Sequence, residues 1–315
     1  MTDDAVLVDG LRVSYGRMHG LDGVSLSVAS GQTLGVLGHN GAGKTSLIRV
    51  LTTQVRPDQG RVLVDGVDVV AHPAQVRSRI GVTGQYAGLD DFLTVMENIE
   101  LVGRLAGLRH AARRRARHLV DQFDLHEFDT RRVGELSGGT RRRVDLAASL
   151  VAAPRVLFLD EPTTGLDPTA RQAVWEVVRD LTAEGTTVVL TTQYLEEADR
   201  LADQVIVLDH GRIAGQGTPR ELKRLVGGKV LRATVPTGRL SVLGNRPHTS
   251  TPAGWGRTTV SYTLPDDDAT IGLLAQLTRD AGGLSDLEVA APSLDDVFFH
   301  LANPAPTTAS AGASA

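Results

Sequence analysis

A glycine-rich stretch near the N-terminus is the first candidate for a chemical function. It matches G-x-x-x-x-G-K-[ST] at every fixed position and holds the candidate phosphate-binding residues Gly38, Asn40, Gly41, Ala42, Gly43, Lys44, Thr45 and Ser46. Its glycines let backbone N–H groups converge on phosphate oxygens at the positive end of a helix. Lys44 adds a mobile cation, and the Thr45 hydroxyl can bind Mg²⁺. The pattern therefore predicts a site for a nucleoside triphosphate and Mg²⁺.

Two adjacent carboxylates form the second chemical feature. Four apolar residues, 156–159, precede Asp160 and Glu161 and indicate a buried strand. Open parallel sheets bind ligands at the carboxyl ends of their strands, so both side chains are expected at such an edge. Asp160 can then face Mg²⁺, and Glu161 can face a water molecule.

Other candidate residues give weaker signals on their own. Ser137, Gly138 and Gly139 open a predicted helix, but serine and glycine are favoured there for structural reasons alone. Tyr15 is either a turn tyrosine at a sheet edge or a flat surface on which adenine stacks. Gln85 and Gln193 each end or follow a predicted strand, at 80–85 and 187–191.

The elements that must position these residues follow from hydrophobic periodicity. An apolar run at 33–37 before the glycine-rich stretch predicts a strand, and 46–51 after it predicts a helix, which is the context the motif requires. Residues 86–153 are predicted to be mainly helical. Their basic runs, 113–115 and 141–143, could contact anionic lipid headgroups or RNA, but such runs are more often solvated helix faces.

Three parts of the chain differ in composition. Residues 1–226 carry all the motifs and are predicted to form one α/β domain, with the helical insertion at about 86–153. Residues 227–302 predict a small α+β domain, with a helix at 269–281 and a capped last helix that starts at Ser293. Residues 303–315 consist of Pro, Thr, Ala, Ser and Gly and predict a disordered tail.

Composition narrows the function classes. Of the 315 residues, 41% are hydrophobic and 22% charged, which is ordinary for a globular protein, and the net charge of -4 gives no sign of nucleic-acid binding. The absence of cysteine excludes disulfides and thiolate chemistry. No apolar run approaches membrane-spanning length, and the acidic start is unlike a secretory signal, so we expect the chain neither to be secreted nor to cross a membrane.

Taken together and in order, the motifs resemble the ATP-binding cassette of ABC transporters over about residues 5–225. Three longer stretches, 137–150, 191–199 and 293–298, look like the daunorubicin/doxorubicin-resistance type of exporter ATPase, and they extend the resemblance over nearly the whole chain. The resemblance implies the P-loop NTPase fold of ABC ATPases, with a mixed sheet core, an antiparallel β subdomain and a helical insertion. The small C-terminal α+β domain follows it.

The resemblance also implies roles for single residues. Two copies would face head to tail, so that Ser137, Gly138 and Gly139 of one close over ATP held by the phosphate loop of the other. Asp160 would hold Mg²⁺ with Thr45, and Glu161 would act as general base. Further residues would contact the nucleotide, its metal or the dimer interface: Lys44 at the β/γ oxygens, Gln85 at Mg²⁺ and the water, Gln193 at the γ-phosphate, Asp167 across the dimer, and Tyr15 on adenine.

Two positions depart from the usual cassette pattern. The signature continues with Thr140 where glutamine is usual, near the interface. Gln193 stands where most cassettes have a histidine. Its amide can donate a hydrogen bond to the γ-phosphate but cannot supply a charge-assisted one, so we expect slower hydrolysis, although the subfamily commonly has glutamine there.

The function that this resemblance implies is an ATP-hydrolysing subunit at the cytoplasmic face of the cell membrane. It would drive a separate multi-span permease that exports a hydrophobic drug or antibiotic, with no nucleic-acid partner. Three alternatives remain open: an importer ATPase, a soluble cassette protein that acts on ribosomes or DNA, and a catalytically idle nucleotide-binding regulator. The intact Lys44, Asp160 and Glu161 weigh against the last.

Overall fold

Short apolar runs far apart in the sequence pair into one six-stranded sheet in the computed structural model. Its order is β10-β9-β3-β8-β7-β6, and its strands are β3 (Thr33–Leu37), β6 (Ile80–Thr83), β7 (Val156–Asp160), β8 (Thr187–Thr192), β9 (Gln204–Asp209) and β10 (Arg212–Gly217). All neighbours are parallel except β9 and β10, which form an antiparallel hairpin. Helices or strands cover both faces, which explains why the central strands read as continuous apolar runs.

The structure describes residues 4–16, 18–84, 88–226, 228–238, 249–264, 267–280 and 285–302. Within these ranges the chain divides after Thr218 into two compact units, which are described separately here. No helix in them combines the length and the apolar character that crossing a bilayer requires.

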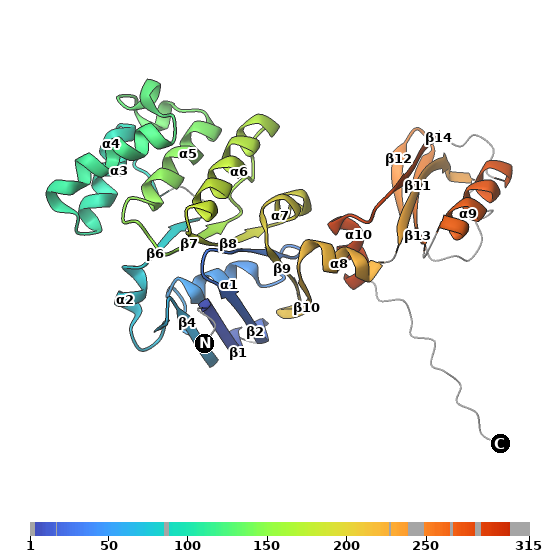
Figure 1. Cartoon of the computed structure of the whole chain (residues 1–315), viewed down its shortest axis with the longest axis horizontal. Helices are drawn as coiled ribbons and strands as arrows, with labels where there is room; N and C mark the ends of the chain where they lie inside the picture. Colours follow the sequence, from blue (N-terminus) through green and yellow to red (C-terminus); the bar gives the residue numbers. More distant parts are fainter. Residues whose placement is uncertain are drawn as a thin grey trace, which may run out of the picture. The chain divides into compact units, whose positions relative to one another are not determined.

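Alternate side chains of β7 serve opposite faces of the sheet. Val156 and Phe158 pack into a core with α1 (Lys44–Leu51) and the antiparallel sheet, whereas Leu157 and Leu159 pack into a second core with the helices. That second layer is built from α5 (Gly138–Ser149), α6 (Pro168–Ala183) and α7 (Leu195–Leu201), seen above the sheet in Figure 1. The period of two along a strand therefore divides one apolar run between two cores.

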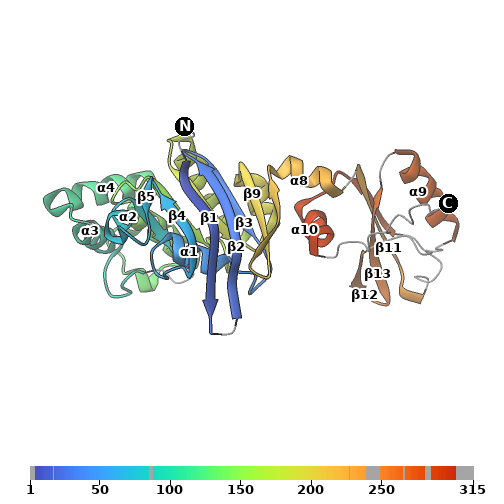
Figure 2. The ribbon, with the colours of Figure 1, turned by 90° about the horizontal axis from the view of Figure 1, so that it is seen from below.

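A four-stranded antiparallel sheet supplies the other layer, with the order β2-β1-β4-β5. Its strands are β1 (Asp4–Tyr15), β2 (Met18–Ala29), β4 (Gln59–Val64) and β5 (Val67–Asp68), and α2 (Pro73–Arg77) follows them. β1 and β2 run side by side over their whole length (Figure 2), and Tyr15 pairs with Met18 at the end of their hairpin. This hairpin thus places Tyr15 on a long, rigid support.

The predicted helical insertion contains α3 (Val95–Leu105), α4 (Ala112–Gln122) and α5, together with short 3₁₀ turns at Arg109–Ala111, His126–Phe128 and Val133–Glu135. Thr94 and Glu97 form a reciprocal capping box that starts α3. One expectation for this region is wrong. Arg142 does not lie on a solvated face but is buried, because it bonds to backbone carbonyls beneath α5.

The C-terminal unit is a separate α+β structure. Its antiparallel sheet has the order β12-β13-β11-β14, and its elements are α8 (Pro219–Val226), β11 (Lys229–Pro236), β12 (Thr249–Gly254), β13 (Arg257–Leu264), α9 (Asp267–Asp280), β14 (Ser285–Ala290) and α10 (Leu294–Ala302). α9 packs on β11 and β13 around the buried Tyr262. Ser293 and Asp296 cap α10 reciprocally, as predicted, and Arg232 on β11 bonds to Asp296.

The predicted fold class is confirmed in both of its parts, the mixed-sheet α/β core and the C-terminal α+β unit. The compact units divide after Thr218, so α8 belongs to the C-terminal unit, whereas the sequence assigned it to the first domain. Gln85 and the tail at 303–315 lie outside the described residues.

Candidate functional site

The phosphate loop joins β3 to α1 through a backbone that only glycine suits. Gly43, the N-cap of α1, has φ 112°, and a Cβ there would lie 2.6 Å from the Gly20 carbonyl oxygen. None of the described side chains caps α1. The first N–H groups of this helix therefore remain available to an external anion, which the helix dipole also favours.

Lys44 projects back into this loop. Its Nζ donates to the carbonyl oxygens of Gly38 (2.7 Å) and His39 (3.2 Å) and lies 3.9 Å from Glu161 Oε1. Only 5% of the residue is exposed. Burial lowers the pKa of Lys44, and the carboxylates of Glu161 and Asp160 oppose that change. A phosphate oxygen is a stronger hydrogen-bond acceptor for this partly desolvated ammonium group than the neutral loop carbonyls are.

β7 delivers the two carboxylates to the same sheet edge as the phosphate loop. β7 and β3 are separated by β8 alone, and all three strands are parallel. Thr191 on β8 donates its hydroxyl proton to Asp160 Oδ1 (2.5 Å) and so fixes one carboxylate oxygen. Asp160 is therefore a buried, oriented anion, which is a suitable ligand for Mg²⁺.

Glu161 has a strained backbone. Its φ of 52° lies in the left-handed region that residues with a side chain rarely adopt. Its N–H donates to the Thr191 carbonyl (3.0 Å), and the Thr164 hydroxyl donates to Glu161 Oε2 (3.1 Å). Strain held in place by surrounding hydrogen bonds is common at functional sites, and here it turns the Glu161 carboxylate toward Lys44.

The phosphate loop, Lys44 and Glu161 line one pocket of about 350 Å³, and Asp160 is not among its lining residues. Its walls come from the phosphate loop and α1, from Glu161, and from the β1–β2 hairpin, with the lining residues Tyr15, Met18, His19, Gly20, Asn40, Gly41, Gly43, Lys44, Thr45, Ser46 and Glu161. Tyr15 is 41% exposed. A Cβ at Gly20 would lie 2.8 Å from Tyr15 Cε2, so glycine leaves room for the ring. The structure thus brings Tyr15 to the phosphate loop, as the sequence proposed; its stacking role stays a prediction.

Ser137, Gly138 and Gly139 line no part of this pocket. Ser137 is the N-cap of α5, and its Oγ accepts from the Thr140 N–H (3.3 Å) and lies 3.0 Å from Thr140 Oγ1. Thr140, where glutamine is usual, is thereby turned inward against its own helix. A Cβ at Gly139 would lie 2.7 Å from Ala170 Cβ on α6, whereas one at Gly138 would meet nothing closer than 4.0 Å.

Two further candidates lie outside the pocket as well. Asp167 is exposed at the start of α6 and caps it by accepting from the Ala170 N–H (2.8 Å). Gln193 is exposed just after β8. Gln85 lies outside the described residues, between Gly84 and Gly88, which are described.

Sequence reasoning missed one buried residue that joins three parts of the site. Arg142 on α5 donates from Nε to the Pro162 carbonyl (2.8 Å) and from Nη1 to the Gly84 carbonyl (2.7 Å), and it pairs with Asp145 (3.1 Å). It therefore ties α5 to the backbone just after Glu161 and to the strand end before Gln85. Only its charge within a run of three arginines was visible in the sequence, and such runs are usually solvated.

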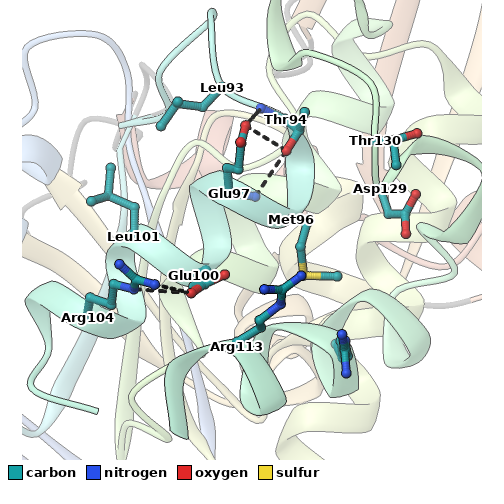
Figure 3. Close-up of a pocket in the computed structure, with 11 residues that line it drawn as sticks. Leu93, Thr94, Met96, Glu97, Glu100, Leu101, Arg104, Arg113, Asp129 and Thr130 are labelled. Atoms are coloured by element: carbon teal, nitrogen blue, oxygen red, sulfur yellow. Dashed lines mark hydrogen bonds and ion pairs between the residues drawn. The ribbon is translucent and has the colours of Figure 1, made fainter. Parts of the chain in front are cut away.

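A second, larger hollow of about 690 Å³ lies between α3 and α4 (Figure 3). Met96 and Leu101 give it apolar surface. Charged groups surround them, including the Glu100–Arg104 ion pair (2.6 Å) and Arg113. This surface lies on the helical insertion, away from the phosphate loop in the sequence, and it shares no residue with the nucleotide pocket.

Comparison with known proteins identifies the family to which this geometry belongs. The family model described as ABC transporter matches residues 21–164. A daunorubicin resistance ATP-binding protein of Streptomyces coeruleorubidus is 48% identical over 96% of both chains. The daunorubicin/doxorubicin resistance ATP-binding protein of Streptomyces peucetius is 45% identical over 94% of this chain and 92% of its own.

A solved structure shares the same fold. It is titled as the ATP-binding subunit of an ABC transporter, is 27% identical, and superimposes with a TM-score of 0.64 over 70% of this chain and 92% of its own. The phosphate loop, the strained Glu161 and the pocket around Lys44 are therefore parts of an ABC ATPase that binds and hydrolyses ATP. The chain belongs to the ATP-binding subunits of ABC transporters, and within them to the daunorubicin/doxorubicin-resistance type.

Proposed function

We propose that this ATPase powers the export of a hydrophobic drug or antibiotic through a separate membrane permease, at the cytoplasmic face of the membrane. The observation that supports it best is the pocket in which Tyr15, Lys44 and Glu161 meet the phosphate loop, because it brings an aromatic ring, a cation and a carboxylate together around the phosphate-binding backbone of one copy. The names of the relatives concern drug resistance, and a transporter confers resistance by removing a compound from the cell.

Within one copy, the pocket holds ATP along its length. The Tyr15 ring stacks on adenine, and the loop N–H groups from Gly38 to Ser46 bind the phosphates together with Lys44. The residues present fit this ligand, because the start of α1 has no side-chain cap, Gly43 has no Cβ to crowd the loop, and the Lys44 ammonium group lies within the loop. Lys44 then neutralises charge on the β and γ oxygens.

The same residues fit Mg²⁺ beside the phosphates. Thr45 offers a hydroxyl, the buried Asp160 offers the carboxylate that Thr191 orients, and Gln85 offers an amide oxygen. When bound, Mg²⁺ supplies charge neutralisation to the phosphate oxygens of the leaving group. Asp160 and Thr45 set the register of the triphosphate relative to Glu161.

Hydrolysis depends on Glu161 as the general base. Its carboxylate accepts a proton from the attacking water, and the Thr164 hydroxyl at 3.1 Å holds its other oxygen in place. Lys44 Nζ lies 3.9 Å from Glu161 Oε1. Gln193 donates an amide hydrogen bond to the γ-phosphate in place of the usual histidine.

A second copy completes the site. Ser137, Gly138 and Gly139 of that copy close over the γ-phosphate, with the positive end of α5 pointing at it. Ser137 and Gly138 are exposed in the single chain, which suits a surface that awaits such a ligand. Asp167, exposed at the start of α6, lies at the same interface.

The permease contacts the hollow between α3 and α4. Its apolar side chains, Met96 and Leu101, and the charged side chains around them suit an amphipathic cytoplasmic segment of a membrane protein (Figure 3). The ATPase domain proposed at residues 1–226 and the accessory domain proposed at 227–302 are divided in the sequence near α8, which packs against α10 and belongs to the C-terminal compact unit.

Export is tested by drug accumulation in a susceptible bacterial host. Cells that express the chain together with a multi-span permease, to be sought in the neighbouring reading frame, should retain less of a hydrophobic drug such as daunorubicin than cells with either protein alone. The chain with Glu161→Gln is the matched control and should not lower retention. Increased accumulation would favour import, and co-sedimentation of the chain with ribosomes in place of membranes would overturn the transport function.

A further inference from the structure

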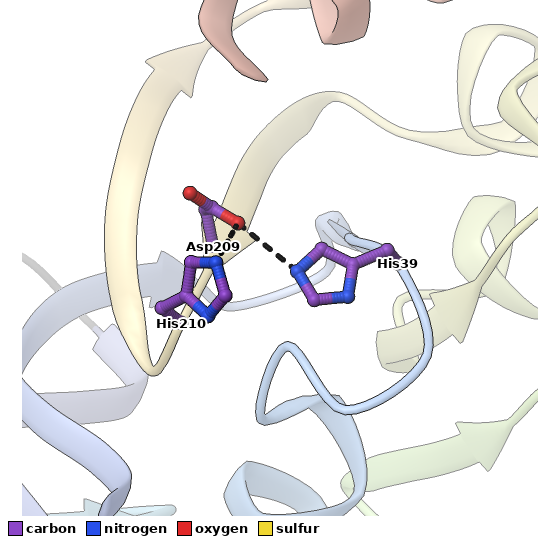
Figure 4. A group of neighbouring side chains, drawn as sticks. All are labelled: His39, Asp209 and His210. Atoms are coloured by element: carbon purple, nitrogen blue, oxygen red, sulfur yellow. Dashed lines mark hydrogen bonds and ion pairs between the residues drawn. The ribbon is translucent and has the colours of Figure 1, made fainter. Parts of the chain in front are cut away.

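Two histidines and one carboxylate meet beside the phosphate loop, and none of the roles above uses them. His39 belongs to the loop, while Asp209 and His210 form the turn between β9 and β10 (Figure 4). One potential ligand atom from each lies within 4.8 Å of the other two. Within the part of the chain that the structure describes, no second group of three such side chains comes this close.

The hydrogen-bond partners of His39 indicate that either an extra proton or a metal ion lies between His39 and Asp209. Its Nδ1 lies 2.7 Å from the Asn40 carbonyl oxygen, and its Nε2 lies 3.0 Å from Asp209 Oδ1. Both partner atoms are acceptors only. A neutral imidazole carries a single N–H, so one ring nitrogen would face an acceptor with its lone pair. The contact therefore needs either a second proton on the ring or a metal ion between the side chains.

The second histidine favours the metal ion. His210 Nε2 lies 3.8 Å from the same Asp209 Oδ1, and the two imidazole rings are 5.3 Å apart at 62°. A proton shared by His39 and Asp209 would give His210 no part in the contact. Two imidazole nitrogens and one carboxylate oxygen are the donors that Zn²⁺ takes in three-ligand sites, with a further position left for water.

We propose that His39, Asp209 and His210 bind a divalent transition-metal ion of the Zn²⁺ type. The Nδ1 of His39 donates to the Asn40 carbonyl, which fixes the tautomer and leaves the Nε2 lone pair for the metal. Asp209 lies between the two imidazoles in Figure 4 and provides the oxygen that both approach. All three side chains reach solvent, so an ion can enter without any opening of the fold.

The bound ion would fasten the phosphate loop to the β9–β10 turn. The two already touch, because the Gly211 N–H donates to the Ala42 carbonyl (3.0 Å). The His39 carbonyl also accepts from Lys44 Nζ (3.2 Å), so a tether at the His39 side chain acts on a residue that contacts the nucleotide-binding lysine. The metal site itself does not depend on the proposed transport function; it concerns the loop whether or not the chain exports anything.

Zinc binding to the full-length chain, without nucleotide and without a polyhistidine tag, tests the proposal. Titration calorimetry and competition with a chromogenic zinc indicator should find one Zn²⁺ per chain. Asp209→Asn and His210→Asn should each weaken binding at least about tenfold, as loss of a ligand does. Asparagine is chosen at position 210 because His210 has φ 45°, which asparagine tolerates. His110→Ala, at another exposed histidine, is the matched control and should bind as the parent does.

Two other measurements separate a built site from incidental binding. Co²⁺ should give the visible absorption of a low-symmetry nitrogen and oxygen site in the parent and not in His210→Asn. Amide hydrogen exchange of residues 39–43 should slow when Zn²⁺ is added, and only when all three ligands are present. Absence of Zn²⁺ binding to the parent, or binding unchanged in Asp209→Asn and His210→Asn, would overturn the metal site and leave a protonated His39 as the explanation. Unchanged exchange in the zinc-bound parent would overturn the tether.

Discussion

Two helix N-termini are assigned to the phosphates of one ATP, α1 of the copy that holds the nucleotide and α5 of a second copy, and their local structures differ. α1 starts at Gly43 with no side-chain cap among the described residues, beside the buried Lys44. α5 starts at Ser137, whose own hydroxyl already accepts from the Thr140 N–H (3.3 Å). An uncapped start must be completed by its ligand, whereas a capped start is stable without one.

The two helix starts also differ in exposure: the start of α1 faces a pocket, whereas the start of α5 faces solvent. α1 opens into a pocket that also contains Glu161 and Tyr15. The start of α5 is exposed, while its body is anchored from beneath by Arg142, which bonds to the Pro162 and Gly84 carbonyls. One half of the site is therefore assembled within the chain, and the other half is a rigid surface presented outward. This difference is what a site completed by a second copy requires.

The largest effect is expected from the base in the assembled half. Glu161→Gln should keep ATP binding and lower turnover about 10²- to 10⁴-fold, because an amide cannot take the proton from water. Steady-state phosphate release and nucleotide binding, measured on the same preparation, check both. Turnover near the parent rate would remove Glu161 from this role.

Substitution of Lys44 should weaken ATP binding, whereas substitution of Glu161 should leave binding intact and lower turnover. Lys44→Ala removes a charged donor to phosphate, worth about 1.5–3 kcal/mol, so ATP should bind about 10- to 100-fold more weakly. Fluorescent-nucleotide titration measures this loss. Lys44→Arg keeps the charge, but only 5% of Lys44 is exposed, so the larger guanidinium group does not fit in the same space. This variant should not restore binding. Unaltered affinity in Lys44→Ala would contradict the phosphate-binding role.

Substitutions at two neighbouring glycines of α5 test its exposed face and its packed face separately. A Cβ at Gly138 has no neighbour closer than 4.0 Å, so Gly138→Ala should leave the chain stable yet lower turnover about tenfold by obstructing a second copy. Gly139→Ala is the matched comparison. Its Cβ would meet Ala170 at 2.7 Å, and it should cost about 1–3 kcal/mol of folding stability.

Thermal unfolding and ATP hydrolysis on both variants decide the matter. If Gly138→Ala hydrolyses ATP as the parent does, the start of α5 does not face a nucleotide on another copy, and the difference between the two helix starts has a structural cause alone.

A smaller change is expected at Gln193, which lies exposed after β8. Gln193→Ala should lower turnover several-fold, about the worth of one neutral hydrogen bond, with little change in ATP binding. Gln193→His, which introduces the usual residue, should raise turnover above that of the parent. A Gln193→Ala protein as fast as the parent would show that the amide has no part in hydrolysis.

The anchor beneath α5 predicts a pH dependence of stability. Burial raises the pKa of Asp145 to about 6, and the neighbouring Arg142 lowers it by less. The unfolded value is near 3.9, so the folded chain holds this proton more tightly. Stability from this group is fully present below about pH 4 and is lost as the pH rises through 6, by about 3 kcal/mol.

Asp145→Asn cannot titrate there. Denaturant unfolding from pH 4 to pH 7 should therefore show the parent losing more stability than Asp145→Asn over that range. Other carboxylates cancel in this difference. A constant offset between the two proteins at all pH values would mean that Asp145 stays ionised beside Arg142 in the folded chain.

Much of the assembled half was predictable because its residues are close in sequence. The glycine-rich loop between a strand and a helix, and the Asp160–Glu161 pair at a strand end, are local patterns whose geometry follows from strand and helix periods. The reciprocal cap of Ser293 and Asp296 is equally local. The position of Tyr15 was left as an alternative, because only the pairing of β1 with β2 carries the ring to the phosphate loop.

Contacts between residues that are far apart in the sequence depend on the tertiary structure. The sequence determined the phosphate loop, the carboxylate pair and the helical insertion through short-range patterns of charge, glycine and apolar spacing. Packing decided that Arg142 lies buried under α5 and that Asp209 and His210 meet His39. Hydrophobic periodicity tells which face of an element is buried, but the partner across that face depends on how the elements stack, and no local pattern carries that information.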